Sequence, residues 1–81
     1  MNEILLLKAR LAEKKKALEE MQLKADSYII VLRDIFDPYI EDFTTIDAER
    51  GEVIAKDFKH LCAKGKELKA QIAKMEKDLN G

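Results

Sequence analysis

The chain has 81 residues, of which 47% are apolar and 38% are charged, and its net charge is −1. The apolar content excludes an intrinsically disordered tail, and a dedicated nucleic-acid-binding protein usually has a basic excess that this chain lacks. A chain of this length forms one small domain, and ordering costs about 1.5 kcal/mol per residue, so nearly all of its apolar surface has to be covered. Size alone therefore predicts self-association or a partner protein.

Charge is distributed unevenly along the chain. Segments 8–24 and 59–78 each hold six basic and three acidic side chains, whereas segment 26–57 holds nine acidic and three basic ones. No apolar run is long enough for a signal peptide or a membrane span. The single cysteine, Cys62, excludes an internal disulfide and suits a reducing compartment. We therefore expect a cytoplasmic protein with a negative middle and positive flanks.

A first helix is predicted over about residues 3–36. Asn2 can cap it, and apolar side chains then recur in alternating steps of three and four residues. The series is Ile4, Leu7, Leu11, Lys14, Leu18, Met21, Ala25, Tyr28, Leu32, Ile35 and Tyr39. Only Lys14 interrupts it. A seven-residue repeat of this length is typical of a supercoiled helix rather than of an isolated amphipathic one.

Asp37-Pro38 ends or kinks the first helix, because the residue before a proline avoids the helical conformation. We expect a tip over residues 37–45, with Thr44 or Thr45 capping a second helix over about 46–79. The second helix has the same spacing of seam residues. They are Gly51, Ile54, Phe58, Leu61, Gly65, Leu68, Ile72, Met75 and Leu79.

Folding the chain at Phe43 sets the two series against each other in antiparallel register. The layers are then Leu7–Leu79, Leu11–Met75, Lys14–Ile72, Leu18–Leu68, Met21–Gly65, Ala25–Leu61, Tyr28–Phe58, Leu32–Ile54 and Ile35–Gly51. Large side chains meet small ones, and we expect Met21 to fill the space above Gly65. Beside the seam, Lys8 is expected to face Glu76.

The predicted fold is therefore all-α: an antiparallel two-helix coiled-coil hairpin that forms a single domain over residues 1–81. Several apolar side chains fall outside both seam series. They are Leu5, Leu6 and Leu23, and then Ile29, Ile30, Val31 and Phe36 close to the tip. Contiguous exposed patches of this kind mark interaction surfaces. A second copy that completes a four-helix bundle is the simplest cover, and antiparallel packing would set each acidic middle beside basic flanks.

The interaction surface is accordingly predicted at the tip-proximal end of the hairpin. Its apolar members are Ile29, Ile30, Val31 and Phe36, and the tip acids Asp37, Glu41 and Asp42 are expected to provide specificity. These acids and Asp47 could share a hard divalent cation. Acids beside a turn and a helix start usually act as caps, however, and we favour that interpretation.

No catalytic, cofactor-binding or metal site is predicted. His60 falls on the solvent side of the second helix and has no nucleophile to activate. Cys62 flanks the seam, where a small thiol is expected to be half-buried and inert. The sequence contains no glycine-rich phosphate loop and no metal-ligand spacing of cysteine or histidine.

We therefore expect a non-enzymatic helical protein that acts as a protein–protein interaction or oligomerisation module. Two alternatives stay open. An accessory or regulatory factor could present the acidic tip to a basic or metal-containing site of a larger machine, and its activity would then depend on Glu41 and Asp42. A nucleic-acid-binding arm could use the lysines of the open end, including Lys14 to Lys16, although a solvated lysine face is the simpler interpretation.

Overall fold

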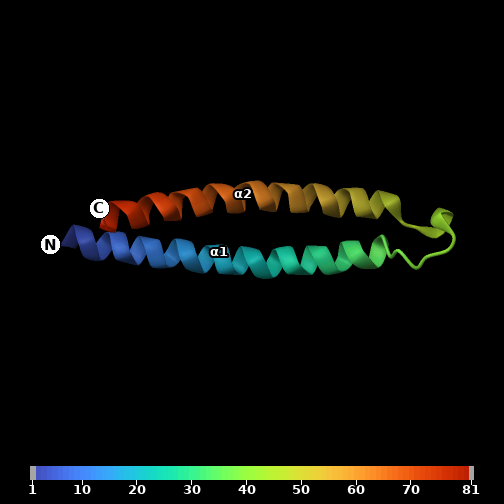
Figure 1. The fold of residues 1–81 in the computed structure, drawn as a ribbon, viewed down its shortest axis with the longest axis horizontal. Coiled ribbons are helices and arrows are strands. Elements are labelled where there is room, and N and C mark those ends of the chain that lie inside the picture. Colours follow the sequence, from blue (N-terminus) through green and yellow to red (C-terminus); the bar gives the residue numbers. More distant parts are fainter. Residues whose placement is uncertain (1, 81) are drawn as a thin grey trace.

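Two long helices packed against each other make up the molecule. In the computed structural model, which describes residues 2–80, α1 spans Asn2–Ile35, a short 3₁₀ helix η1 spans Phe43–Thr45, and α2 spans Ala48–Asn80. The helices run antiparallel, so that both chain ends lie at one end of a rod, the open end, and the connecting loop forms the tip at the other (Figure 1). The predicted all-helical architecture is confirmed, and residues 2–80 contain no strand. Met1 and Gly81 lie outside the described residues.

Burial follows the predicted seven-residue repeat. Every predicted seam residue from Leu7 to Ile35, and from Gly51 to Leu79, is buried or half-buried. The two outermost members of the first series, Ile4 and Tyr39, are instead 57% and 89% exposed. Ile4 lies beyond the last predicted layer, and Tyr39 follows Pro38 in the tip, so neither side chain has a helix opposite it.

Contacts across the seam identify the register. The rings of Tyr28 and Phe58 meet edge to face with their centroids 6.3 Å apart, a favourable aromatic geometry, and these residues form one of the predicted layers. A Cβ atom placed on Gly51 would lie 3.3 Å from Cγ2 of Ile35, its predicted partner. Both contacts agree with the register expected from the two heptad series.

Lys14, the one charged side chain of the seam, is accommodated by sending its ammonium group out of the layer. Its Nζ donates a hydrogen bond to Oε1 of Gln71 on α2, at 2.8 Å. Gln71 precedes Ile72, the predicted partner of Lys14, and Ile72 is one of the most buried residues at 7% exposure. The half-buried lysine thus covers apolar surface with its stem while its charge stays in water.

Two expected contacts are wrong. Nothing lies within 4 Å of a Cβ atom placed on Gly65, so Met21 does not fill the space beside that residue. Glu76 pairs with Lys15, at 3.1 Å between Oε1 and Nζ, rather than with Lys8. Lys8 and Lys15 lie one heptad apart on the same side of α1, so both can approach Glu76. An exposed pair of this kind contributes only about 0.2–1 kcal/mol.

Two aspartates shape the tip. Oδ1 of Asp37 accepts a hydrogen bond from the backbone N–H of Tyr39 at 2.9 Å, which turns the chain after α1. Oδ1 of Asp42 accepts hydrogen bonds from the backbone N–H and the hydroxyl of Thr44, at 3.0 and 2.6 Å, and caps η1. Pro38 ends α1, so the backbone N–H groups of Tyr39 and Thr44 have no helical acceptor, and they donate to these two carboxylates instead.

A third aspartate caps α2. Oδ1 of Asp47 accepts a hydrogen bond from the backbone N–H of Arg50 at 3.1 Å, which is the geometry of an N-cap. The expected capping by Thr44 or Thr45 is therefore wrong, because both threonines belong to η1. The helix accordingly begins at Ala48, two residues later than expected.

The hairpin is a thin rod with little interior. It measures 64 × 17 × 15 Å, and its radius of gyration is 18.3 Å, compared with about 12 Å for a compact domain of this length. Ile35 and Ile72 are the only apolar side chains of the described residues that count as buried, at 8% and 7% exposure. Most side chains of the seam are therefore only half-buried between the two helices.

Candidate interaction surface

The two flanks of the seam differ in chemistry. One of them, the apolar flank, is defined by the positions one step beyond the seam: Gln22, Ile29 and Phe36 on α1, with Ala55 and Cys62 on α2. Within each helix these positions lie seven residues apart, so they follow the same side of the rod, and none of them is charged. The corresponding positions of the other flank hold Lys24, Val31, Arg50, Asp57 and Lys64. The apolar flank is thus the side suited to a dry contact.

An aromatic ring protrudes from the tip-proximal part of the apolar flank. The side chain of Phe36 is 49% exposed, and that of Ile29, one heptad away, is 41% exposed. The Phe36 ring lies so close to the backbone of Gly51 on α2 that a Cβ atom there would clash with it. The missing side chain at Gly51 therefore lets the ring rest against α2.

A hollow opens on the same flank, nearer the open end. It has a volume of about 150 Å³, and it is lined by Met21, Gln22, Ala25, Leu61, Cys62 and Gly65. Gln22 and Cys62 belong to the apolar flank, and the other four residues belong to the seam. The hollow exists because the seam position at Gly65 has no side chain. Sequence reasoning missed it, although a glycine opposite a flexible methionine was a signal.

The predicted apolar interaction residues lie on three sides of α1. Ile29 and Phe36 lie on the apolar flank. Val31 is half-buried on the other flank, where it lines a hollow of about 300 Å³ together with residues of the tip. Ile30 is 61% exposed on the outer side of α1 and lines a further hollow of about 350 Å³ with Phe36 and Tyr39. The structure thus sets Ile29 and Phe36 together and separates them from Val31.

The tip carries exposed aromatic side chains that sequence reasoning did not identify as surface residues. Tyr39 and Phe43 are 89% and 79% exposed. Tyr39 fits the heptad series, but Pro38 ends the helix before it, and that proline was the available signal. Among the predicted tip acids, Asp37 is half-buried and Glu41 is exposed.

Three aspartates of the tip, Asp37, Asp42 and Asp47, bind backbone N–H groups nearby in the chain. The pKa of Asp42 is lowered by hydrogen bonds from the side chain and the backbone of Thr44, so its carboxylate form is favoured. Within residues 2–80, no group of three or more histidine, cysteine, aspartate or glutamate side chains is placed to hold a metal ion. Capping accounts for Asp37, Asp42 and Asp47 without a cation.

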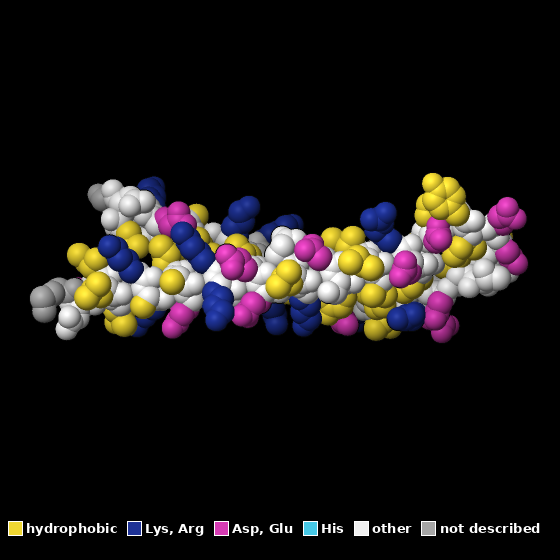
Figure 2. All heavy atoms as spheres, turned by 90° about the horizontal axis from the view of Figure 1, so that it is seen from below, with side chains coloured by type: hydrophobic (Ala, Val, Ile, Leu, Met, Phe, Trp, Pro, Cys, Tyr) yellow, Lys and Arg dark blue, Asp and Glu magenta, His cyan; other side chains and the backbone are white. Residues whose placement is uncertain are grey.

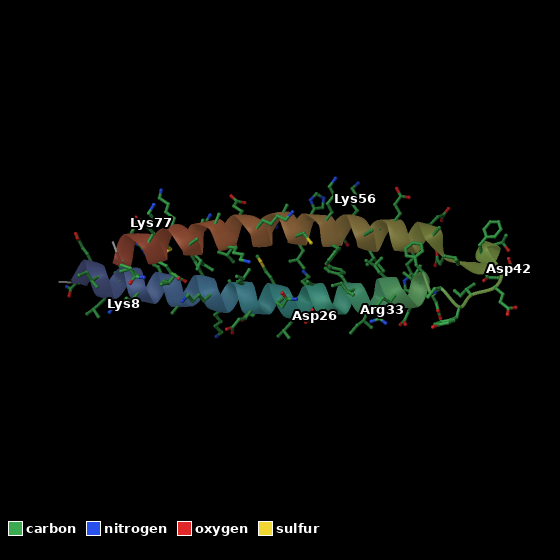
Figure 3. All side chains as sticks on the ribbon, viewed as in Figure 1. Lys8, Asp26, Arg33, Asp42, Lys56 and Lys77 are labelled. Atoms are coloured by element: carbon green, nitrogen blue, oxygen red, sulfur yellow. The ribbon has the colours of Figure 1, made fainter. Side chains whose placement is uncertain are left out.

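Charge is also segregated along the rod. Figure 2 looks onto the outer side of α1, where acidic side chains dominate the tip and most lysines and arginines lie toward the open end. Hydrophobic side chains gather over the tip-proximal half of α1 and again at the open end. Asp42 lies at the tip, and Lys56 and Lys77 project from α2 on the side away from α1 (Figure 3). The charged groups thus occupy the outer surfaces and the ends rather than the apolar flank near Ile29.

Comparison with known proteins adds no family. No protein-family model matches the chain, and neither a curated protein nor a solved structure matches it. Within residues 2–80, neither helix is long and apolar enough to cross a membrane.

Proposed function

We propose that the protein is a non-enzymatic, cytoplasmic interaction module that binds a second copy of itself to form an antiparallel four-helix bundle. The observation that carries this proposal is the surface that one hairpin leaves exposed. Its accessible area is 6947 Å², whereas a compact protein of 9.3 kDa exposes about 5,000 Å². The excess of about 2,000 Å² is more than twice the roughly 800 Å² that each partner buries in a standard interface.

Part of this excess is apolar and lies where a second hairpin can cover it. Ile29 and Phe36 are 41% and 49% exposed on the uncharged flank, beside a seam that is itself only half covered. Complete burial of such a side chain contributes about 1.5–3 kcal/mol relative to full exposure. A small domain needs contributions of this kind, because its own core rarely supplies more than about 3–5 kcal/mol.

The distribution of charge supports the antiparallel orientation. The tip-proximal segment 26–57 holds nine acidic and three basic side chains, and the segments nearer the open end are basic. Parallel packing would place two acidic tips side by side. Antiparallel packing places each tip beside the basic part of the other copy, so that opposite charges meet along the interface.

The cysteine supports a cytoplasmic location. Cys62 is a free thiol, half-buried on the apolar flank. Small domains that work in oxidising compartments are usually stabilised by paired cysteines, whereas free thiols persist in the reducing cytosol.

Solution mass tests the proposal, and two adjacent isoleucines provide a matched pair of variants. Ile29→Lys introduces a charge on the apolar flank, whereas Ile30→Lys introduces it on the outer side of α1, where the side chain is already 61% exposed. We expect the wild type and Ile30→Lys to be dimers by light scattering and Ile29→Lys to be a monomer. A wild type that stays monomeric at high micromolar concentration contradicts the proposal, and so does disruption by Ile30→Lys alone.

A second candidate function is supported by the tip itself. Tyr39 and Phe43 are 89% and 79% exposed beside the exposed Glu41, which gives the tip an aromatic and acidic surface suited to a basic site on a larger protein. A photo-crosslinker placed at Phe43 would then capture a protein other than this chain, and Glu41→Gln would weaken the capture without changing helix content. Capture of only a second copy of the chain would contradict this candidate.

A further inference from the structure

The protruding ring and the hollow on the apolar flank are placed symmetrically about Ile29. Phe36 lies seven residues after Ile29, and Gln22, which lines the hollow, lies seven residues before it. On α2, Phe36 rests on Gly51, four residues before Ala55, and the hollow begins at Leu61, six residues after Ala55. A two-fold axis through Ile29 and Ala55, perpendicular to the rod, therefore brings the ring of each copy to within about one helical turn of the level of the other copy's hollow.

We propose, building on the self-association described above, that the apolar flank binds a second, antiparallel copy of the chain whose Phe36 ring fills the hollow beside Gly65. The two-fold axis generates the reciprocal contact at the same time, because each copy offers the same ring and the same hollow. Ile29 of the two copies meets near the axis on the α1 side, and Ala55, a small residue, lets the two α2 helices approach each other.

The hollow has the size and the lining for a phenyl ring. Its volume is about 150 Å³, and a cavity of about that size with an aliphatic lining accommodates benzene. Five of its six lining residues are apolar or glycine, and the sixth is Gln22, which is exposed. No atom lies within 4 Å of a Cβ placed on Gly65, so the space beside that residue is open to an incoming side chain.

The same axis sets the acidic tip of each copy against lysines of the other. Lys15 and Lys69 continue the apolar flank toward the open end, one heptad beyond Gln22 and Cys62, and Glu76 on the same flank pairs with Lys15 and leaves this part of the flank with a net positive charge. At 1.5 Å of rise per residue, Lys15 lies about 21 Å from Ile29. The rod is 64 Å long and about 40 Å of it separates Asn2 from Ile29, which leaves about 24 Å between Ile29 and the tip. The tip of the second copy thus reaches the level of Lys15.

A parallel dimer on this flank lacks these contacts. It would place the two hollows opposite each other, leave both of them empty, and bring the two acidic tips together. Four charged residues border the flank: Asp26 and Arg33 on α1, and Glu52 and Lys59 on α2. Each meets an opposite charge in the parallel as well as in the antiparallel dimer, so these residues do not favour one orientation over the other. The ring, the hollow and the lysines at positions 15 and 69 favour the antiparallel dimer.

Filling the hollow from within is the direct test. Gly65→Leu places a side chain in the hollow and improves helix propensity, so the hairpin keeps its helix content. Because it blocks the hollow, we expect it to raise the dimer dissociation constant about 30-fold, the effect typical of losing a central aromatic contact. Phe36→Ala should have a similar effect. Ala63→Leu adds the same side chain at an exposed position on the outer side of α2 and should leave the dissociation constant unchanged.

The double variant and a distance measurement complete the experiment. Phe36→Ala with Gly65→Leu should weaken the dimer no more than the stronger single change, because both remove one contact, whereas additive effects would mean that the two sites are independent. A nitroxide label can be attached to Ala73→Cys in a Cys62→Ser background, and double electron–electron resonance then measures the distance between the labels of the two copies. In the antiparallel dimer each label lies 18 residues of α2 from the two-fold axis at Ala55, so the distance should be about 50 Å. Parallel copies would place these labels within roughly 25 Å, since they lie at the same level of one bundle.

The outcomes separate this inference from the proposal on which it rests. A wild type that remains monomeric overturns both. A wild-type dimer that is unaffected by Gly65→Leu, shows additive single changes, or gives the short label distance overturns the ring-in-hollow contact and leaves self-association standing.

Discussion

The two seam glycines should respond in opposite ways to the same substitution. Gly51 and Gly65 both lie inside α2, where glycine costs about 1 kcal/mol relative to alanine. At Gly65 an added Cβ meets nothing within 4 Å. Gly65→Ala should therefore recover the full propensity and stabilise the protein by about 1 kcal/mol, which raises the midpoint of thermal unfolding by about 4–8 °C for a domain of this size.

At Gly51 the same methyl group fits only if the Phe36 ring moves aside. It would clash with the Phe36 ring and lie 3.3 Å from Cγ2 of Ile35. The half-exposed Phe36 ring has to move off Gly51 to make room, and the burial that the ring then loses offsets the gain in propensity. Gly51→Ala should therefore give no gain or a net loss, and the displaced Phe36 ring should also weaken the dimer.

Thermal melts followed by circular dichroism measure both variants against the wild type. The melts are compared at the same protein concentrations, because the stability of a dimer depends on concentration. Equal stabilisation by the two substitutions would refute the reasoning, since it would mean that Phe36 does not rest on Gly51. A loss of stability in Gly65→Ala would mean that the space beside Gly65 is already filled.

Three further predictions follow from individual contacts. Lys14→Leu should raise the free energy of unfolding by about 0.5–1 kcal/mol in chemical denaturation, because half-burial of the leucine outweighs the exposed hydrogen bond from Lys14 to Gln71. The control Lys16→Leu, at an exposed position, should change the free energy of unfolding little. Asp47→Ala should cost about 1 kcal/mol through loss of the α2 cap, whereas Thr44→Ala should cost less; the reverse order would contradict the assigned cap. The lowered pKa of Asp42 means that its carboxylate stabilises η1 above the ordinary pKa of an aspartate, and that this support is lost as the pH falls through the lowered pKa. The amide signal of Thr44 should therefore shift in that acidic range in an NMR titration. A shift centred on the ordinary aspartate pKa would contradict the hydrogen bonds.

The seam and its register were predictable because they depend on periodicity alone. Eighteen positions spaced by three and four residues can be buried together in one antiparallel arrangement, and all of them are buried or half-buried. Lys14 did not disturb this pattern, because a lysine can lie in a seam and still place its ammonium group in water.

The features that sequence reasoning missed depend on rotamers and on choices between equivalent partners. Whether Met21 fills the space beside Gly65 is decided by the conformation of a flexible side chain, which volume matching cannot supply. Lys8 and Lys15 compete for Glu76 from equivalent heptad positions, and Thr44, Thr45 and Asp47 were all suitable caps. The sequence indicated an apolar surplus near the tip, but only the structure separates the apolar flank, where ring and hollow face the same way, from the other sides of α1.

Self-association through the apolar flank is the central claim, and the mass of the wild-type chain in solution tests it most directly. Sedimentation equilibrium from low to high micromolar concentration, at low and at moderate salt, should show a species of twice the 9.3 kDa chain mass. Salt should loosen this dimer moderately, because it screens the attraction between the acidic tip and the lysines of the other copy. A single species of 9.3 kDa throughout the concentration range would contradict the claim.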